Sequence, residues 1–250
     1  MPISYRSVAI SDKGRVRPNN EDRVADFRSK QGAVWMVCDG MGGHAAGEKA
    51  AELAVRAVID FFERMPPMDP LTLLETALHE ANKAIYTVAQ VHPQYRKMGT
   101  TCVVALHADD KVYYAHVGDS RLYHYRNGTL TQKTQDHSYV QFLIQQGLIS
   151  PEEAEFHPRR NIILRALGLS PRAEPEVAPE PITVQPGDII MLCSDGLSSM
   201  LSDEEIAKIL RLWRVPLLER AQELVHAANE AGGHDNISVI LVEFFDKKDS

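Results

Sequence analysis

The stretch that decides the fold is VCDGMGG at residues 37–43, in which Asp39 ends an apolar run and is followed by glycine. Two further segments, LCSDG at 192–196 and GGHDNIS at 232–238, place Asp195 and Asp235 in a similar setting. Aspartates at strand ends, beside exposed backbone, are how proteins gather oxygen ligands around hard divalent cations. The sequence therefore predicts a metal site assembled from distant residues, with metal-assisted hydrolysis as its chemistry.

The composition is that of a globular protein, with 44% hydrophobic and 24% charged residues among 250. A formal net charge of -7 gives no basic footprint, so neither nucleic acid nor an anionic membrane is expected as a partner. No early stretch resembles a signal peptide, and no apolar run approaches the roughly 18 residues of a membrane span. The three cysteines are widely spaced and form no CxxC pair. We therefore expect a cytoplasmic protein with reduced core thiols.

Short runs rich in β-branched and aromatic residues, bounded by Gly, Asn, Asp or Pro, predict strands. They lie at 4–10, 32–39, 100–106, 111–118, 120–126, 188–195 and 237–244. Apolar residues at helical spacing predict one helix that ends before Pro66 and a second over about 70–91. Ser202 and Glu205 form a capping-box pattern that begins a third helix, and the fourth ends at the glycines before His234.

The order of these elements favours one layered domain. Few strands alternate singly with helices, so a mixed or antiparallel arrangement is preferred over a doubly wound parallel sheet. Residues 171–187 carry five prolines and are interpreted as a surface loop or edge segment within that domain. We predict an α/β (α+β) fold over residues 1–250: a four-layer αββα sandwich whose two mostly antiparallel sheets are flanked by helices.

Seven motifs occur in the order found in one protein family. They are GRVRPNNED at 14–22, VCDGMGGHAAGE at 37–48, MGTT at 98–101, GDSR at 118–121, ILRALG at 163–168, CSDGL at 193–197 and HDNIS at 234–238. A single Asp-Gly motif indicates only a turn. The ordered set, however, covers nearly the whole chain, which resembles the metal-dependent (PPM, type-2C) serine/threonine protein phosphatases, particularly the bacterial members.

The resemblance implies a site for two Mn²⁺ or Mg²⁺ ions. By analogy, Asp39 bridges the two ions and the carbonyl of Gly40 binds one of them. Asp195 and Asp235 complete the protein ligands of the other. Carboxylates and water suit these metals better than zinc, which prefers His and Cys.

Further residues acquire expected roles from the same resemblance. Glu21 and Asp22 are expected to hold metal-bound waters. Arg17 is expected to bind the phosphate, since a guanidinium fork fits two phosphoryl oxygens. Asp119 lies in a tight turn between two strand-like segments, and with Asp195 it is expected to bind a third metal ion.

Proton delivery to the leaving group is left open. Animal members carry DGHGG, with a histidine proposed as general acid, whereas this chain has Met41, which cannot donate a proton. His44 could take that role or could be structural at the start of a helix. Metal-bound water is another candidate. Residues 137–168 occupy the position of the family's flap, which influences the docking of phosphoproteins.

The resulting hypothesis is metal-dependent hydrolysis of phosphoserine and phosphothreonine in proteins by a metal-activated water. The chain is expected to be a monomer that acts on phosphorylated proteins, among them a bacterial Ser/Thr kinase that it opposes. One alternative is a catalytically weak phosphoprotein-binding signalling module of the same fold, which Met41 leaves open. Another is a two-metal phosphoesterase for small molecules or nucleic acid, although its usual His-rich ligands are missing from the motifs.

Overall fold

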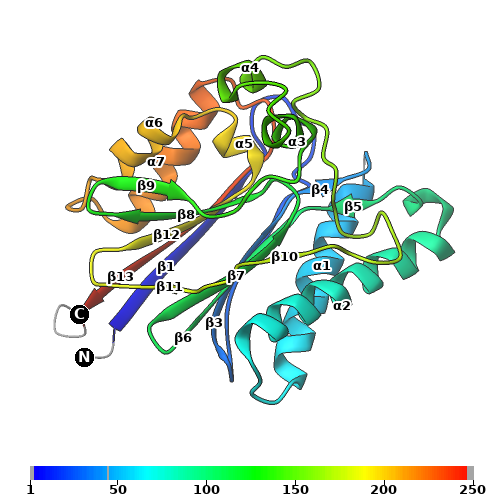
Figure 1. Ribbon diagram of the computed structural model, residues 1–250, viewed down its shortest axis with the longest axis horizontal. Helices are drawn as coiled ribbons and strands as arrows, with labels where there is room; N and C mark the ends of the chain where they lie inside the picture. Colours follow the sequence, from blue (N-terminus) through cyan, green and yellow to red (C-terminus); the bar gives the residue numbers. More distant parts are fainter. Residues whose placement is uncertain (1–2, 44, 247–250) are drawn as a thin grey trace.

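The computed structural model (Figure 1) describes residues 3–43 and 45–246. Two sheets pack face to face, and helices cover the outer face of each sheet. Strand pairs in the described part of the chain run antiparallel. The predicted fold class, a four-layer αββα sandwich, is therefore confirmed. Among the same residues, no helix has the length and apolar character needed to cross a membrane.

Strand β3 (Gly32–Cys38) is apolar throughout because it is buried on both faces. Val34 and Met36 pack beneath the helices of the first sheet. Trp35 and Val37, which alternate with them, pack against the second sheet. Successive side chains of a strand point to opposite faces, so a strand between two layers needs a continuous hydrophobic run. This burial fixes the point at which the chain leaves the core, immediately before Asp39.

The first sheet has the strand order β10-β7-β6-β3-β2, and β11 also pairs with β7. The bounds of its other strands are Arg23–Ser29 (β2), Cys102–Ala108 (β6), Lys111–Val117 (β7), Glu176–Val177 (β10) and Ile182–Thr183 (β11). Helices α1 (Ala45–Arg64) and α2 (Pro70–Val91) pack on its outer face. The proline-rich segment 171–187 thus supplies edge strands, as predicted, and α2 has the predicted bounds.

The second sheet has the order β1-β13-β12-β8-β9. Its strands are β1 (Ile3–Asp12), β8 (Arg121–Arg126), β9 (Thr129–Gln132), β12 (Ile189–Cys193) and β13 (Ile237–Asp246). Its outer face is covered by α5 (Asp195–Ser198), α6 (Asp203–Leu210) and α7 (Leu217–Glu230). The predicted capping box of α6 is present: the Ser202 hydroxyl accepts from the Glu205 amide, and the Glu205 carboxylate accepts from the Ser202 amide.

Short elements lie at the end of the sandwich where Asp39 emerges (Figure 1). Strands β4 (Gly40–Met41) and β5 (Gly99–Thr100) form a small separate sheet. The 3₁₀ helix η1 (Pro93–Tyr95) precedes β5. Helices α3 (Tyr139–Gln145) and α4 (Pro151–Glu155) belong to segment 137–168, the predicted flap, and lie at the top of the view.

The turn that holds Asp119 connects the two sheets. Strand β7 belongs to the first sheet and β8 to the second, so the strands on either side of this turn do not pair with each other. Gly118 has a φ of 106°, which an L side chain rarely adopts. The turn is therefore not a hairpin: it carries the chain from the first sheet to the second.

Asp188 secures the beginning of β12, the strand that leads to Asp195. Its carboxylate accepts hydrogen bonds from Arg126 Nε at 2.8 Å and from the Gln185 amide at 2.9 Å. Burial alone would raise the pKa of Asp188, but Arg126 and His124 lower it to about 2. The carboxylate is thus fully paired although it is only 1% exposed.

We predict that Asp188→Ala lowers the free energy of unfolding by about 2–3 kcal/mol, because Arg126 and the Gln185 amide lose their acceptor. Urea unfolding measures the difference. The matched control is Glu230→Ala, which removes an exposed ion pair with Arg15 and should change stability by less than about 0.5 kcal/mol. Equal effects of the two substitutions would contradict the assignment.

Candidate active site

The predicted site residues gather around one cleft of about 440 Å³ at the end of the sandwich. Asp39 follows β3, Asp195 begins α5 directly after β12, and Asp235 precedes β13. The loop between β1 and β2 closes the cleft from the other side. Its lining includes Arg17, Glu21, Asp39, Gly40, Asp195 and Asp235. The structure therefore brings together residues that are up to 218 positions apart.

The backbone of Asp39 is fixed by two threonines on the neighbouring strand segment. The Asp39 amide donates to Thr101 Oγ1 at 3.1 Å, and the Asp39 carbonyl accepts from the Thr101 amide at 2.9 Å. Thr100 Oγ1 donates to the same carbonyl at 2.8 Å. Both threonines are fully buried. The Asp39 carboxyl is thus presented from a rigid backbone, and MGTT acquires a role that the motif alone did not reveal.

Gly40 lies where a side chain would not fit. A Cβ atom at this position would overlap the carbonyl oxygens of Gly47 and Glu21. Helix α1 and the β1–β2 loop therefore approach the backbone directly beside Asp39. This close approach explains the glycine after Asp39.

The acidic side chains repel one another in this cleft. Desolvation is the largest cause of the raised pKa of Asp39, and the charges of Asp22, Asp195 and Asp119 add to it. The Asp195 carboxyl group interacts directly with that of Asp39 and adds to the raised pKa of Asp39, which favours a proton on it. Desolvation and Asp235 likewise raise the pKa of Asp195. A cation would take the place of such a proton.

Asp22 lies behind the cleft and is 1% exposed. Ser194 Oγ donates to its Oδ2 at 2.8 Å. Its Oδ1 has no hydrogen-bond partner among the described residues. Burial, followed by repulsion from Asp195 and Asp235, raises its pKa to about 7 despite that hydrogen bond. Ser194, the residue before Asp195, thereby links two of the predicted acids.

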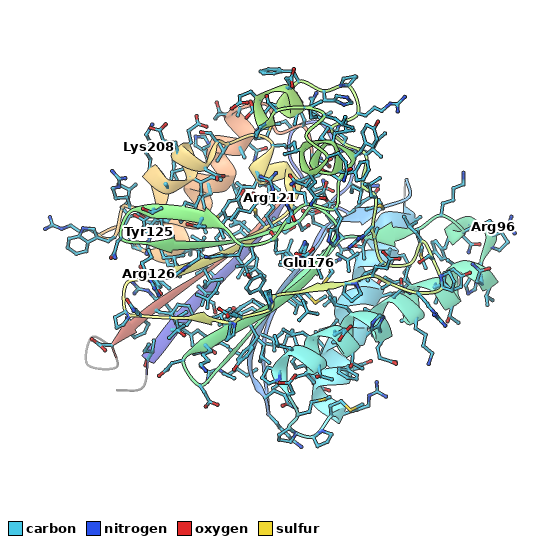
Figure 2. The ribbon with its side chains drawn as sticks, viewed as in Figure 1. Arg96, Arg121, Tyr125, Arg126, Glu176 and Lys208 are labelled. Atoms are coloured by element: carbon cyan, nitrogen blue, oxygen red, sulfur yellow. The ribbon has the colours of Figure 1, made fainter. Side chains whose placement is uncertain are left out.

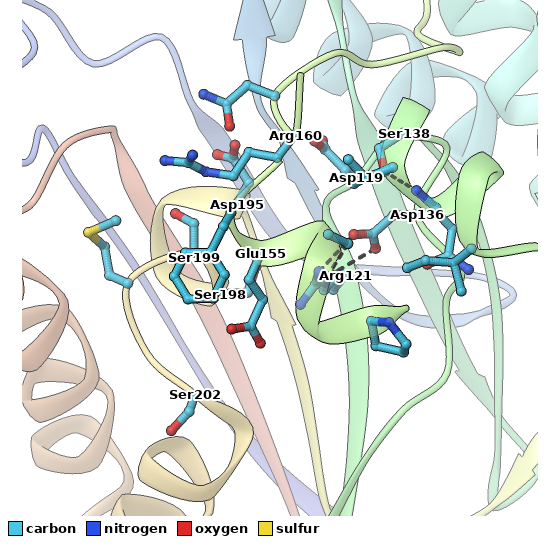
Figure 3. A pocket seen from close by; sticks show the side chains of 18 of the residues that line it. Asp119, Arg121, Asp136, Ser138, Glu155, Arg160, Asp195, Ser198, Ser199 and Ser202 are labelled. Carbon is cyan, nitrogen blue, oxygen red and sulfur yellow. Dashed lines mark hydrogen bonds and ion pairs between the residues drawn. The ribbon is translucent and has the colours of Figure 1, made fainter. Parts of the chain in front are cut away.

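Asp119 lines an adjacent cleft of about 630 Å³ together with Asp195 (Figure 3). It is 8% exposed, and desolvation and the Asp195 charge raise its pKa to about 8. The neighbouring Arg121, which follows the turn, makes a two-pronged ion pair with Asp136 in which Nη2 and Oδ2 are 2.7 Å apart. The Arg121 side chain therefore pairs with the Asp136 carboxylate and not with that of Asp119.

Arg17 extends into the first cleft and pairs with Asp235, with Nη2 and Oδ2 2.5 Å apart. Partial burial opposes its charged form, but Asp235, Asp39 and Asp195 outweigh this and raise its pKa. Its side chain is 54% exposed. The guanidinium is thus a solvent-facing cation at the rim of an acidic cleft, where it can meet an anionic substrate.

Asn236 holds the loop that carries Arg17, a role that sequence analysis missed. Its Nδ2 donates to the carbonyls of Lys13 at 2.8 Å and Asn19 at 2.9 Å. Its Oδ1 accepts from the Glu21 amide at 2.8 Å. One buried amide thereby joins the β1–β2 loop to the segment that holds Asp235. HDNIS was recognised as a motif, but its pattern does not indicate which backbone groups the asparagine reaches.

Met41, which cannot donate a proton, and His44, a candidate donor, have different outcomes. Met41 lines the cleft, so the residue that cannot donate a proton does lie at the site. His44 lies outside the described residues. Segment 137–168, the predicted flap, contributes Asn161 to the linings of both clefts.

The side chains present fit hard divalent cations. Potential donors around the first cleft are carboxylates and backbone carbonyls, with no histidine or cysteine in its described lining. Besides Asp22 Oδ1, the oxygens Asp119 Oδ1 and Asp195 Oδ1 are buried and lack partners within the described part of the chain. Buried carboxylate oxygens usually have partners, and oxygen-only donor sets suit Mg²⁺ and Mn²⁺.

Comparison with known proteins identifies the class. The family described as Protein phosphatase 2C matches residues 15–241. The serine/threonine phosphatase stp of Listeria welshimeri is 42% identical over 238 residues, which cover 93% of both chains. The protein phosphatase PhpP of Streptococcus pneumoniae is 38% identical, with coverage of 93% of this chain and 95% of that one. The chain therefore belongs to the protein phosphatase 2C family.

Solved structures agree with this assignment. The serine/threonine phosphatase PstP/Ppp of Mycobacterium tuberculosis superposes with a TM-score of 0.88 at 40% identity, covering 97% of this chain and 99% of that one. A PstP catalytic domain described in complex with 2 manganese ions gives 0.84 at 38% identity, covering 98% and 100%. These enzymes confirm the expected class, a serine/threonine protein phosphatase, and do not favour the binding-module alternative.

Removal of divalent cations should make the folded state less stable as pH rises. Folded Asp22 and Asp119 keep their protons up to pKa values of about 7 and about 8, whereas an unfolded aspartate titrates near 3.9. Between these values the folded state binds more protons, so the free energy of unfolding falls with increasing pH. Urea unfolding in EDTA should show a loss on the order of a few kcal/mol between about pH 5 and pH 8.

The variant Asp119→Asn tests the origin of this slope. It removes one of the four carboxyl groups whose pKa values are raised, so stability in EDTA should depend less steeply on pH than in wild type. Saturating Mn²⁺ should flatten the wild-type profile as well. Greater stability at the higher pH in EDTA would contradict the interpretation.

Proposed function

We propose that the cleft around Asp39 hydrolyses phosphoserine and phosphothreonine in proteins, with two Mn²⁺ or Mg²⁺ ions as cofactors. The observation that carries this proposal is the gathering of Asp22, Asp39, Asp119 and Asp195 with raised pKa values beside an exposed arginine. Such an arrangement is costly without cations and provides a place for a phosphoryl group with them.

The proposed ligand set is the one that the family resemblance implies, and its residues line one cleft, which supports it. Asp39 would be shared by both ions, with the Gly40 carbonyl on one and Asp195 and Asp235 on the other. Glu21 and Asp22 would hold waters behind them. When bound, the cations lower the pKa of water and offset the charge of the phosphoryl oxygens. The Thr100 and Thr101 hydrogen bonds keep Asp39 from moving, and this rigidity supports such a shared role.

Arg17 is the proposed phosphate-binding residue. Its fork is held at the rim by Asp235, and the loop behind it is held by Asn236. With Asp235 as a metal ligand, the Arg17 guanidinium would be free to donate to phosphoryl oxygens, and Arg17 would be paired in both states. Proton delivery to the leaving alkoxide remains assigned to His44 or to water, since Met41 has no proton to give.

A third cation is proposed at Asp119 and Asp195, because both line the cleft of Figure 3 and both have buried oxygens without partners in the described residues. Segment 137–168 would act as the flap that faces the phosphoprotein. The proposed partners include a Ser/Thr kinase. We propose that the protein is a cytoplasmic monomer. The buried free cysteines support the cytoplasm, because thiols stay reduced there.

Phosphate release from a phosphothreonine peptide with Mn²⁺ tests the function. Chelation should abolish turnover, and Asp195→Asn should reduce kcat by at least about 100-fold because it removes a proposed ligand. Asp136→Asn is the matched control from the same adjacent cleft: its carboxylate pairs with Arg121, so a smaller loss is expected. Peptide binding without turnover in the Mn²⁺-loaded wild type would overturn the proposal.

For Arg17, we predict that Arg17→Ala raises KM for the phosphopeptide about tenfold or more, because a charged hydrogen bond contributes about 1.5–3 kcal/mol. Arg17→Lys should recover part of this loss, since it keeps the charge and loses the fork. Arg15→Ala is the control, because Arg15 pairs with Glu230, whereas Arg17 pairs with Asp235 in the cleft. Steady-state kinetics in which the Arg15 and Arg17 variants behave alike would reject the assignment.

A further inference from the structure

A second group of metal-binding side chains lies outside the acidic clefts. His116 on β7, His137 before α3 and Glu176 on β10 each offer one ligand atom, and these atoms all lie within 4.8 Å of one another. His116 and Glu176 are opposite each other in the β7–β10 register, so their side chains share one face of the sheet. Figure 2 labels Glu176 on the edge strand, below the flap helices.

The two histidines of the group are buried, and the glutamate is exposed to solvent. His116 is 2% and His137 is 8% exposed, whereas the Glu176 side chain is 48% exposed. A cation could therefore enter from solvent past the carboxylate and meet the two imidazole rings. The rings stack with 4.6 Å between their centroids and 21° between their planes, so the His137 ring would have to turn to share an ion with His116. Burial is also the largest cause of the lowered pKa of both histidines, to about 4 for His137, so the rings are neutral as metal ligands must be.

His116 has its outer hydrogen bond already in place. Its Nε2 lies 2.8 Å from the carbonyl of Gln135, which accepts the ring proton. The lone pair of the neutral ring is then on Nδ1. Ligating histidines characteristically donate their other N–H to a carbonyl or carboxylate, which fixes the tautomer and the ring orientation.

His137 is held between the Asp119 turn and Glu176. Its Nδ1 lies 3.2 Å from the Gly118 amide, and its Nε2 lies 3.3 Å from Glu176 Oε2. Ligation through Nε2 would place the ring proton on Nδ1, which now accepts from the Gly118 amide. The His137 ring would therefore have to turn away from that amide as it binds the cation. The nearby Arg165 is a competing positive charge, but its ion pair with Glu174 at 3.4 Å offsets it.

We propose that His116, His137 and Glu176 bind a zinc-class divalent cation, with water as the fourth ligand. Two imidazoles and one carboxylate form the donor set that Zn²⁺ favours, whereas the oxygen-only cleft suits Mn²⁺ and Mg²⁺. The chain therefore carries two sites of different chemical preference. A cation at this second site would connect His116 on β7 with Glu176 on β10 and with His137, the first residue of the flap segment. His116 lies three residues before Asp119.

Co²⁺ spectroscopy on the Mn²⁺-saturated protein tests this proposal. Tetrahedral Co²⁺ with nitrogen ligands gives intense visible ligand-field bands, whereas Co²⁺ that displaces Mn²⁺ from the oxygen-only cleft gives weak ones. We expect the intense bands with one equivalent of Co²⁺ in wild type, and their loss on addition of Zn²⁺. Glu176→Gln should weaken Co²⁺ affinity at least about tenfold. Glu174→Gln, which removes the neighbouring carboxylate that pairs with Arg165, should leave the bands unchanged.

His116→Asn provides a second variant in case one substitution alters folding. Circular dichroism and Mn²⁺-dependent hydrolysis of p-nitrophenyl phosphate check that each variant is folded, and Glu176→Gln should match wild type in both. Failure of that hydrolysis in wild type would count against the proposed function and not against this site. Weak bands in wild type would overturn the proposal, as would intense bands with the same Co²⁺ affinity in wild type and in Glu176→Gln.

Discussion

The repulsion between carboxyl groups at one end of the sandwich is the constraint on which the site depends. Burial and mutual charge raise the pKa values of Asp22, Asp39, Asp119 and Asp195. The strong burial of β3 and β12 provides the rigidity that keeps these groups together. Stability invested in the core thus maintains a local arrangement that is unfavourable without cations, as is common at functional sites.

Much of this architecture could be predicted from the sequence. Continuous apolar runs predicted β3, β12 and β13, and the capping box and the prolines predicted the helix boundaries. Strands β2 and β9 were missed because β2 is rich in charged residues and β9 has only four residues. Such strands are defined by pairing with a neighbour more than by their own hydrophobicity.

The site residues also divide into those that the sequence pattern predicts and those that only contacts between distant segments define. Asp39, Asp195 and Asp235 could be found because each has glycine nearby at the boundary of an apolar run. Asn236 and Thr101 act through hydrogen bonds to backbone groups of distant segments, and spacing along the chain carries no trace of such contacts. The His116, His137 and Glu176 group likewise exists only through the β7–β10 register and the path of the chain after β9.

Strands β1 and β13 pair along ten residues each, from Ile3 opposite Asp246 to Asp12 opposite Ile237. Arg17 follows the first of these strands, and Asp235 precedes the second. During synthesis, β1 must wait until the residues of β13 have left the ribosome before it acquires this neighbour. Contacts of such long sequence separation form slowly. A product that lacks β13 would therefore leave β1, and the loop that follows it and carries Arg17, without the strand that holds β1 in the sheet.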